Sequence, residues 1–179
     1  MSLDALRESL PAYAKDLSLN LSSLAAETVM TDQQKWGCFV ASAYALGSGP
    51  VIRAVNAEAK AQGLSEEAHT AAKAAAAIMA MNNVYYRSLH IMHAGPEYRT
   101  LPARLRMTVI GAPGVDKVDF ELWCTAVSAI NGCGMCLDAH EEELKKRGVP
   151  NTAIQATLRI GAVINAVSKV ADAEEAANG

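Results

Sequence analysis

Helix-forming residues run through this chain from one end to the other, and this feature limits the fold more than any other. Alanine, leucine, glutamate and lysine have high helix propensity, and they dominate almost every segment. No stretch alternates apolar and polar side chains between turn signals, as a half-buried strand does. The pattern predicts an all-α fold with helices near Leu3–Lys15, Asp32–Leu46, Val51–Gln62, Ser65–Leu89, Leu101–Val109, Lys117–Ile130, Cys133–Arg147 and Thr152–Ala171.

Glycine and proline clusters separate these segments and indicate where the helices end. Residues with short polar side chains stand where the following helices begin, because such side chains bond the free N–H groups of a first turn. Three of them, Ser65, Asp116 and Asn151, are predicted N-caps.

Length and charge limit the organisation and the partners of the protein. A chain of 179 residues with 51% hydrophobic content can bury one sizeable core, so we expect a single domain over residues 1–179. The net charge is −3 and the sequence pI is about 5.8. Lysine and arginine are scattered along the chain, which argues against nucleic acid and membrane surfaces as partners.

The first residues, MSLDALRESLPAYAKDL, contain acidic side chains and lack the apolar core of a signal peptide. No apolar run approaches the length of a membrane-spanning helix. The sequence therefore predicts a soluble protein in the cytoplasm.

Four cysteines are too few for a secreted disulfide scaffold. Cys38 and Cys124 lie in apolar helical patterns and are predicted core residues. Cys133 and Cys136 form a C-x-x-C pair, which in a cytosolic protein is typical of redox or metal chemistry.

The C-x-x-C pair lies at a predicted break between two helices. With Asn131 as N-cap, Cys133 would fall in the first helical turn, where free N–H groups and the helix dipole lower a thiol pKa. Cys136 follows three residues later and His140 four residues after that, so all three would share one helix face. This spacing prearranges a dithiol and a base.

Three kinds of site fit these residues to different degrees. A zinc site built from Cys133, Cys136 and His140 lacks an evident fourth ligand. A thioredoxin module would need a strand before the cysteines, and none is predicted. A catalytic dithiol on a helical scaffold fits best, in which one thiolate attacks a peroxide or disulfide and the other resolves the product. The alternative is a non-catalytic protein whose dithiol and His140 hold a metal or sense oxidation.

Peroxide chemistry also needs a proton path, because the leaving oxygen must be protonated. Glu121 is a candidate, since it lies among apolar neighbours in FELW, but it could equally be a solvent-facing residue of the first turn. His140 precedes three glutamates and could likewise be an exposed polar side chain. The residues alone leave both alternatives open.

Four segments, LPAYAKDLSLNLSSL, AAIMAMNNVYYR, FELWCTAVSAINGC and CLDAHE, are similar in order and spacing to the alkylhydroperoxidase D family. This family is the C-x-x-C peroxidase branch of the carboxymuconolactone decarboxylase-like superfamily. The resemblance covers nearly the whole chain and implies an all-helical subunit in a homotrimer, an antioxidant peroxidase of alkyl hydroperoxides with no bound cofactor or metal. It further implies that protein-bound dihydrolipoyl groups of a dihydrolipoamide acyltransferase supply the electrons, and that an alkyl hydroperoxide reductase peroxiredoxin is a partner.

Carried over by position, the resemblance makes Cys136 the thiol that forms a sulfenic acid, and Cys133 its proton donor and disulfide partner. Glu121 and His140 occupy the proton-relay positions. Met135 departs from the pattern, because well-known members carry histidine there and methionine cannot shuttle protons. A position at a helix start favours Cys133 as the more acidic thiol, whereas the resemblance assigns attack to Cys136, and we follow the family.

Overall fold

A computed structural model of the chain describes residues 1–178 and confirms the predicted all-α class. No strand occurs in that range. The elements are α1 (Leu3–Ser9), the 3-10 turn η1 (Ala12–Ala14), α2 (Lys15–Ala25), α3 (Asp32–Leu46), α4 (Gly49–Ala61), α5 (Glu66–Ile91), α6 (Gly95–Tyr98), α7 (Thr108–Gly111), α8 (Lys117–Ile130), α9 (Gly134–Lys146) and α10 (Asn151–Asn178).

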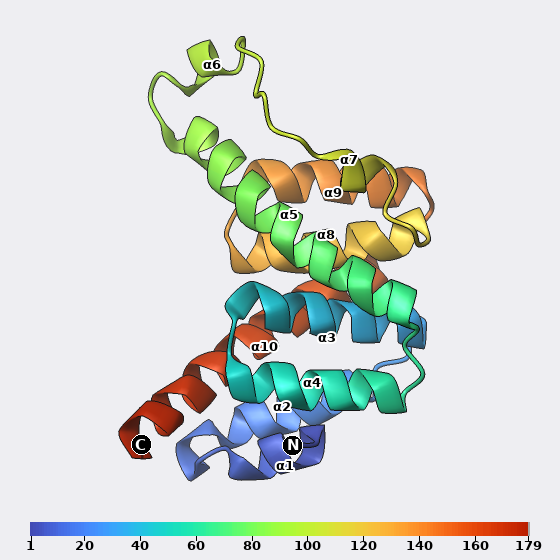
Figure 1. Cartoon of the computed structure of the whole chain (residues 1–179), viewed down its shortest axis with the longest axis vertical. Helices are drawn as coiled ribbons and strands as arrows, with labels where there is room; N and C mark the ends of the chain where they lie inside the picture. The colour runs from blue at the N-terminus through green and yellow to red at the C-terminus, as the bar shows by residue number, and fades with distance from the viewer. Residues whose placement is uncertain (179) are drawn as a thin grey trace.

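Helix α3 lies at the centre of the molecule and packs against α4, α5, α8 and α10 (Figure 1). Helix α5 crosses α3, α8 and α9, while α1 and α2 lie beyond α4 at the opposite end. The core contains the aromatic side chains Trp36, Phe39, Phe120 and Trp123, all from α3 and α8. The core thus holds α8, which leads directly into the cysteine pair, in a fixed position.

The alanine-rich first half of α5 allows close packing of this helix on its neighbours. Ala68, Ala72 and Ala75 are fully buried within the chain itself, where α5 meets α3 and α8. Small side chains let helix axes approach each other, so α5 can lie flat across both helices. This contact positions the second half of α5 over α9.

The structure corrects two predicted helices. The expected helix Leu3–Lys15 ends at Ser9, because Pro11 disfavours helical backbone at the residue before it, and Leu10 is extended. A separate helix, α2, follows and was missed. The expected helix Leu101–Val109 is wrong, since only α7 is helical there.

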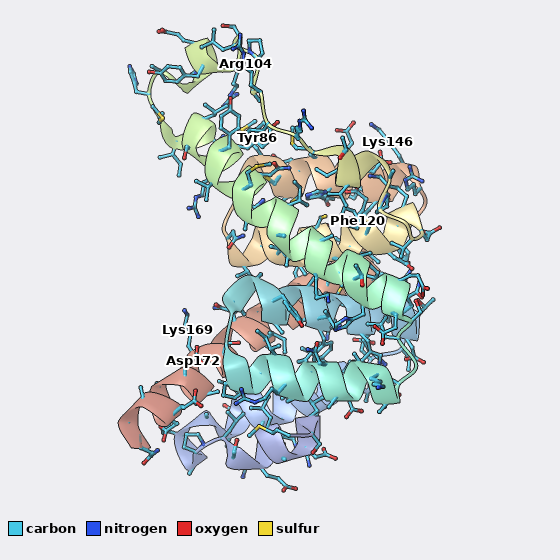
Figure 2. All side chains as sticks on the ribbon, in the orientation of Figure 1. Tyr86, Arg104, Phe120, Lys146, Lys169 and Asp172 are labelled. Carbon is cyan, nitrogen blue, oxygen red and sulfur yellow. A yellow bond between two sulfur atoms is a disulfide. The ribbon has the colours of Figure 1, made fainter. Side chains whose placement is uncertain are left out.

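The residues between α6 and α7 explain the second correction. Pro102 lacks a backbone N–H for a helical hydrogen bond, and Arg104 has a φ of 52°, outside the right-handed helical region. The end of α5, helix α6 and this segment form a projecting arm, residues 84–107 (Figure 1). Figure 2 shows Tyr86 near the base of the arm and Arg104 farther out.

Helix starts agree well with the predicted caps. The side chains of Ser65 and Asp116 accept hydrogen bonds from the N–H groups of Ala68 and Val118. Asn151 is the exception: it was predicted as an N-cap, but it is the first residue of α10 itself. Within residues 1–178, no helix is both long and apolar enough to span a bilayer.

Candidate active site

The corner between α8 and α9 brings the two cysteines together. Asn131 was predicted to cap the second helix, but it ends α8 instead, and Cys133 itself occupies the N-cap position of α9. Gly132 has a φ of +65°, which a side chain would disfavour, so the chain can turn sharply there. Cys133 therefore lies just before the first turn of α9, and not within it.

Cys133 and Cys136 are joined by a disulfide with a Cα–Cα distance of 5.3 Å. Their surroundings differ, because Cys133 is fully enclosed while Cys136 is 7% exposed and lines a cavity. A molecule that enters this cavity therefore meets the sulfur of Cys136 and not that of Cys133.

Glu121 and His140 are in direct contact, and His140 lines the same cavity as Cys136. Glu121 Oε2 is 2.6 Å from His140 Nδ1, and Lys117 Nζ donates to Glu121 Oε1 at 2.8 Å. Both Glu121 and His140 are buried, so neither is the solvent-facing residue that its sequence position also permitted. The structure thus brings together the four residues that sequence reasoning singled out.

The charge state of Glu121 follows from two opposed effects. Burial raises the pKa of the carboxyl group, since it disfavours the charged form. Hydrogen bonds and positive charge from His140 and Lys117 oppose that effect and leave the pKa below its ordinary value. Glu121 is therefore a carboxylate at neutral pH and can accept a hydrogen bond from the adjacent imidazole.

Sequence reasoning missed a methionine in this site. Met79 Sδ of α5 lies 3.3 Å from His140 Nε2, and Ser128 Oγ donates to the same sulfur at 3.5 Å. The two ring nitrogens of His140 thus face two acceptors, a carboxylate and a thioether. An imidazole that carries a proton on each nitrogen could donate to both.

The cavity in front of Cys136 has a volume of about 230 Å³ and mainly apolar walls. Its lining comes from α5, α7 and α9 and comprises Met79, Asn82, Tyr86, Ile110, Met135, Cys136, Ala139 and His140. The residues from α5 follow helical spacing within AAIMAMNNVYYR, so one face of that helix forms a wall. A small organic molecule with an apolar body fits such a space better than a strongly charged one.

The remaining cysteines are core residues, as predicted. Cys38 and Cys124 are fully buried, and burial raises the pKa of the Cys38 thiol to about 12. Burial also raises the pKa of Cys124 well above its ordinary value. Neither thiol supplies a nucleophile at neutral pH. No group of three or more histidine, cysteine or acidic side chains arranged for a metal occurs among residues 1–178.

Comparisons with known proteins agree with one another. Residues 96–179 match the carboxymuconolactone decarboxylase family. The chain is 61% identical to the alkyl hydroperoxide reductase AhpD of Hyphomonas neptunium, over 98% of this chain and 97% of that protein. It is 59% identical to the AhpD of Maricaulis maris, over 97% and 99% of the two chains. Identity to the AhpD of Streptomyces coelicolor is 57%, over 97% of each.

Proposed function

The chain belongs to the AhpD family of alkyl hydroperoxide reductases, and from this membership we propose a peroxidase cycle carried by Cys133 and Cys136. The protein is an oxidoreductase that acts on peroxide and has an antioxidant role. The observation that carries the proposed cycle is the enclosed disulfide, one sulfur of which lines an apolar cavity. The residues, their roles and the electron donor belong to the proposal.

In the reduced protein, the thiolate of Cys136 attacks the terminal oxygen of an alkyl hydroperoxide. The O–O bond breaks, Cys136 becomes a sulfenic acid, and the departing alkoxide takes a proton to leave as an alcohol. The thiolate of Cys133 then attacks the Cys136 sulfur, water leaves, and the disulfide forms. Enclosure of Cys133 beside Cys136 supports this order, because the resolving sulfur needs contact only with its partner.

Glu121 and His140 supply the proton path in this proposal. His140 lies one turn after Cys136 on α9, and the carboxylate of Glu121 holds its ring at 2.6 Å. His140 accepts the proton that leaves a thiol and returns a proton to the alkoxide or the leaving hydroxide. Glu121 stabilises the protonated ring, and Lys117 positions the carboxylate.

The oxidised protein must regain two electrons and two protons after each turnover. We propose that a protein-bound dihydrolipoyl group supplies them, carried by a dihydrolipoamide acyltransferase. A lipoyl group is a slender apolar chain that ends in a dithiol, so it suits an apolar cavity of about 230 Å³ that opens on Cys136. We also propose an alkyl hydroperoxide reductase peroxiredoxin as a partner whose disulfide the reduced dithiol reopens.

A homotrimer is the proposed assembly. The arm carries five large apolar side chains that are exposed in the single chain, namely Val84, Ile91, Met92, Tyr98 and Leu101. Several of them line an apolar groove of about 620 Å³. Apolar patches of this kind mark contact surfaces, so other copies of the chain are the expected cover.

Turnover with purified components tests the electron supply. We expect dihydrolipoamide to sustain reduction of cumene hydroperoxide, and Cys136→Ser to abolish it. Cys124→Ala is the matched control, since it removes a buried thiol that lies outside the cavity lining. Turnover with thioredoxin alone would contradict the lipoyl donor. Stoichiometric zinc in fresh reduced protein, lost in Cys136→Ser, would favour a metal-binding protein instead.

A further inference from the structure

Asn82 of α5 is a buried residue of the cavity lining, and its amide oxygen makes no hydrogen bond within the protein. Its side chain is only 5% exposed, and its Oδ1 atom lacks a hydrogen-bond partner. The neighbouring residue, Asn83, shows the opposite behaviour: its Nδ2 donates to Ser128 Oγ and its Oδ1 accepts from Asn131 Nδ2. Asn83 therefore joins α5 to α8 and the turn after it, whereas the amide oxygen of the adjacent Asn82 is left without a partner.

A buried polar atom without a partner is costly, and most such atoms in proteins are satisfied. In the described part of the chain, three other buried side-chain atoms share this condition, on Trp36, Ser42 and Ser168. None of these three residues lines the cavity of Cys136, whereas Asn82 does. The unpartnered oxygen of Asn82 thus belongs to a residue that lines the same cavity as the candidate nucleophile.

Helical spacing fixes where the amide lies in the cavity. Asn82 follows Met79 by three residues and precedes Tyr86 by four, so all three lie on the same face of α5. Met79 contacts His140, and Cys136 and His140 form the opposing wall on α9. Asn82 therefore lines the same cavity as Cys136 and His140.

We propose that Asn82 binds the hydroperoxide group of the substrate, an inference that rests on the peroxidase function proposed above. A hydroperoxide offers one O–H donor and two oxygen acceptors, and an asparagine amide offers a carbonyl acceptor and two N–H donors. The amide oxygen accepts the hydroperoxide O–H, while an amide N–H donates to the oxygen that carries the alkyl group. The terminal oxygen is then held for attack by Cys136.

The same contact assists bond breaking. When the Cys136 thiolate attacks the terminal oxygen, the O–O electron pair moves to the alkyl-bearing oxygen, which becomes negative. The Asn82 N–H stabilises that charge until a proton from the His140 side completes the alcohol, and the terminal O–H remains on sulfur as the sulfenic acid. A preorganised amide donor on a developing oxyanion is a strong catalytic contribution.

The other walls define which peroxides fit. Tyr86, Ile110 and Met135 surround the amide with mainly apolar surface. A bulky alkyl or aryl group gains contact with these walls, whereas hydrogen peroxide has no such group. The substrate class that this arrangement selects is therefore an organic hydroperoxide held by its polar end.

Two oxidants distinguish a contact between Asn82 and the hydroperoxide group from a general disturbance of the dithiol. Fully reduced Asn82→Leu is mixed with cumene hydroperoxide, and loss of thiols is followed in a single turnover by rapid quench and mass spectrometry. We expect the second-order rate constant to fall by about 10²–10³, the loss typical of an oxyanion donor. Oxidation of the same dithiol by hydroxyethyl disulfide, which has no hydroperoxide group, is expected at the wild-type rate.

Stability provides an independent readout. Leucine replaces an unpartnered amide with an apolar group of similar size, so the melting temperature is expected to stay equal or rise. Asn82→Ala, which removes the amide without adding bulk, is the second variant and must show the same selective loss. Asn165→Leu is the matched control, because it removes a half-buried amide on α10, away from the cavity lining.

The outcomes distinguish this inference from the function on which it rests. Wild-type rates with cumene hydroperoxide in Asn82→Leu or Asn82→Ala would overturn the role of Asn82 alone. Equal slowing with both oxidants would also overturn it, since the amide would then act on the dithiol or its packing. A wild-type protein whose dithiol ignores hydroperoxides would overturn the peroxidase cycle itself.

Discussion

At the scale of single residues, the charge on Glu121 is the feature on which the proposed chemistry depends. Its pKa lies below the ordinary value, because His140 and Lys117 outweigh the opposite effect of burial. A carboxyl group whose pKa is depressed on folding stabilises the protein above its unfolded pKa, and this stabilisation disappears as the pH falls through the folded pKa. The ion pair of Glu121 with His140 therefore stabilises the protein at neutral pH, and protonation of Glu121 in acid removes it.

Replacement of Glu121 by glutamine tests the proton path. The amide keeps the size of the side chain but cannot balance a charge on His140, so we expect peroxide reduction to slow by roughly 10²–10⁴. The double variant Glu121→Gln/His140→Gln should lose little more than the worse single variant, because the two act as one unit. Steady-state turnover with excess dihydrolipoamide measures both effects.

Asp119→Asn is the matched control for that experiment. Asp119 is also a buried carboxylate of α8, but it accepts hydrogen bonds from Gln33 and Gln34 on α3 and lies outside the cavity lining. We expect it to affect stability and to leave the pH profile of turnover unchanged. Near-full turnover in Glu121→Gln would show that the carboxylate is only structural.

The buried thiols give a second prediction at this scale. A pKa of about 12 leaves roughly one Cys38 thiol in 10⁴ ionised at pH 8, and the raised pKa of Cys124 acts in the same direction. Iodoacetamide should therefore label Cys136 in the reduced native protein and spare both buried residues. Peptide mapping by mass spectrometry checks this, and denatured protein, in which all four cysteines react, is the control.

At the scale of elements, the crossing of α3 and α8 has almost no spare room. A Cβ atom added at Gly37 of α3 would lie 2.1 Å from the Trp123 ring on α8. Both partners are enclosed by the core, so neither can move aside without loss of packing. Because α8 leads into Cys133, this crossing also determines where the site lies.

Gly37→Ala should therefore destabilise the protein by about 1–3 kcal/mol, the usual cost of overpacking, although alanine is the better helix former. Urea unfolding measures the change. Gly111→Ala is the control, because a Cβ there meets no atom within 4 Å and the backbone φ is not positive. If Gly37→Ala were as stable as the wild type, α3 and α8 could move apart without loss of free energy, which would contradict the tight crossing.

Element by element, the sequence predicts what depends on local chemistry. Propensity and caps locate α3, α5 and α8, and the spacing of Cys136 and His140 places both on one face of α9, where both line the cavity. The break at Pro11 and the arm escaped prediction, because helix-forming residues there cannot overcome a proline or an unfavourable φ.

The wall formed by α5 could not be predicted in the same way. Met79 is separated from His140 by 61 residues, so only the packing of α5 across α9 brings them together. No local pattern distinguishes Asn82, which faces the cavity, from Asn83, which is bonded to α8 and the turn after it. Contacts between distant segments depend on helix packing angles, which propensity does not specify.

At the scale of the whole molecule, the arm gathers five large apolar side chains that a single chain leaves exposed. The arm projects beyond the body of the subunit (Figure 1). Exposure of this apolar surface to water is unfavourable, and assembly would remove it. The resemblance supplies the number three, which the sequence and the single chain do not determine.

Light scattering at micromolar concentration should give three times the 18.9 kDa mass of the chain. Ile91 is 71% exposed on the arm, so Ile91→Glu should lower the observed mass by placing a charge in the contact. Leu19→Glu, at a 57% exposed leucine of α2, should keep the wild-type mass. A monomeric wild type would reject the trimer.

The enclosure of the Cys133–Cys136 disulfide also affects how the protein relates to other thiols in a cell. Disulfides exchange electrons only when one sulfur touches another. Cys133 is wholly enclosed and Cys136 opens only on an apolar cavity, so a charged thiol such as glutathione must shed its water to reach either sulfur. We expect this enclosure to slow exchange between the dithiol and the bulk thiol pool. The rate at which its oxidation state changes would then depend on which molecules can enter the cavity.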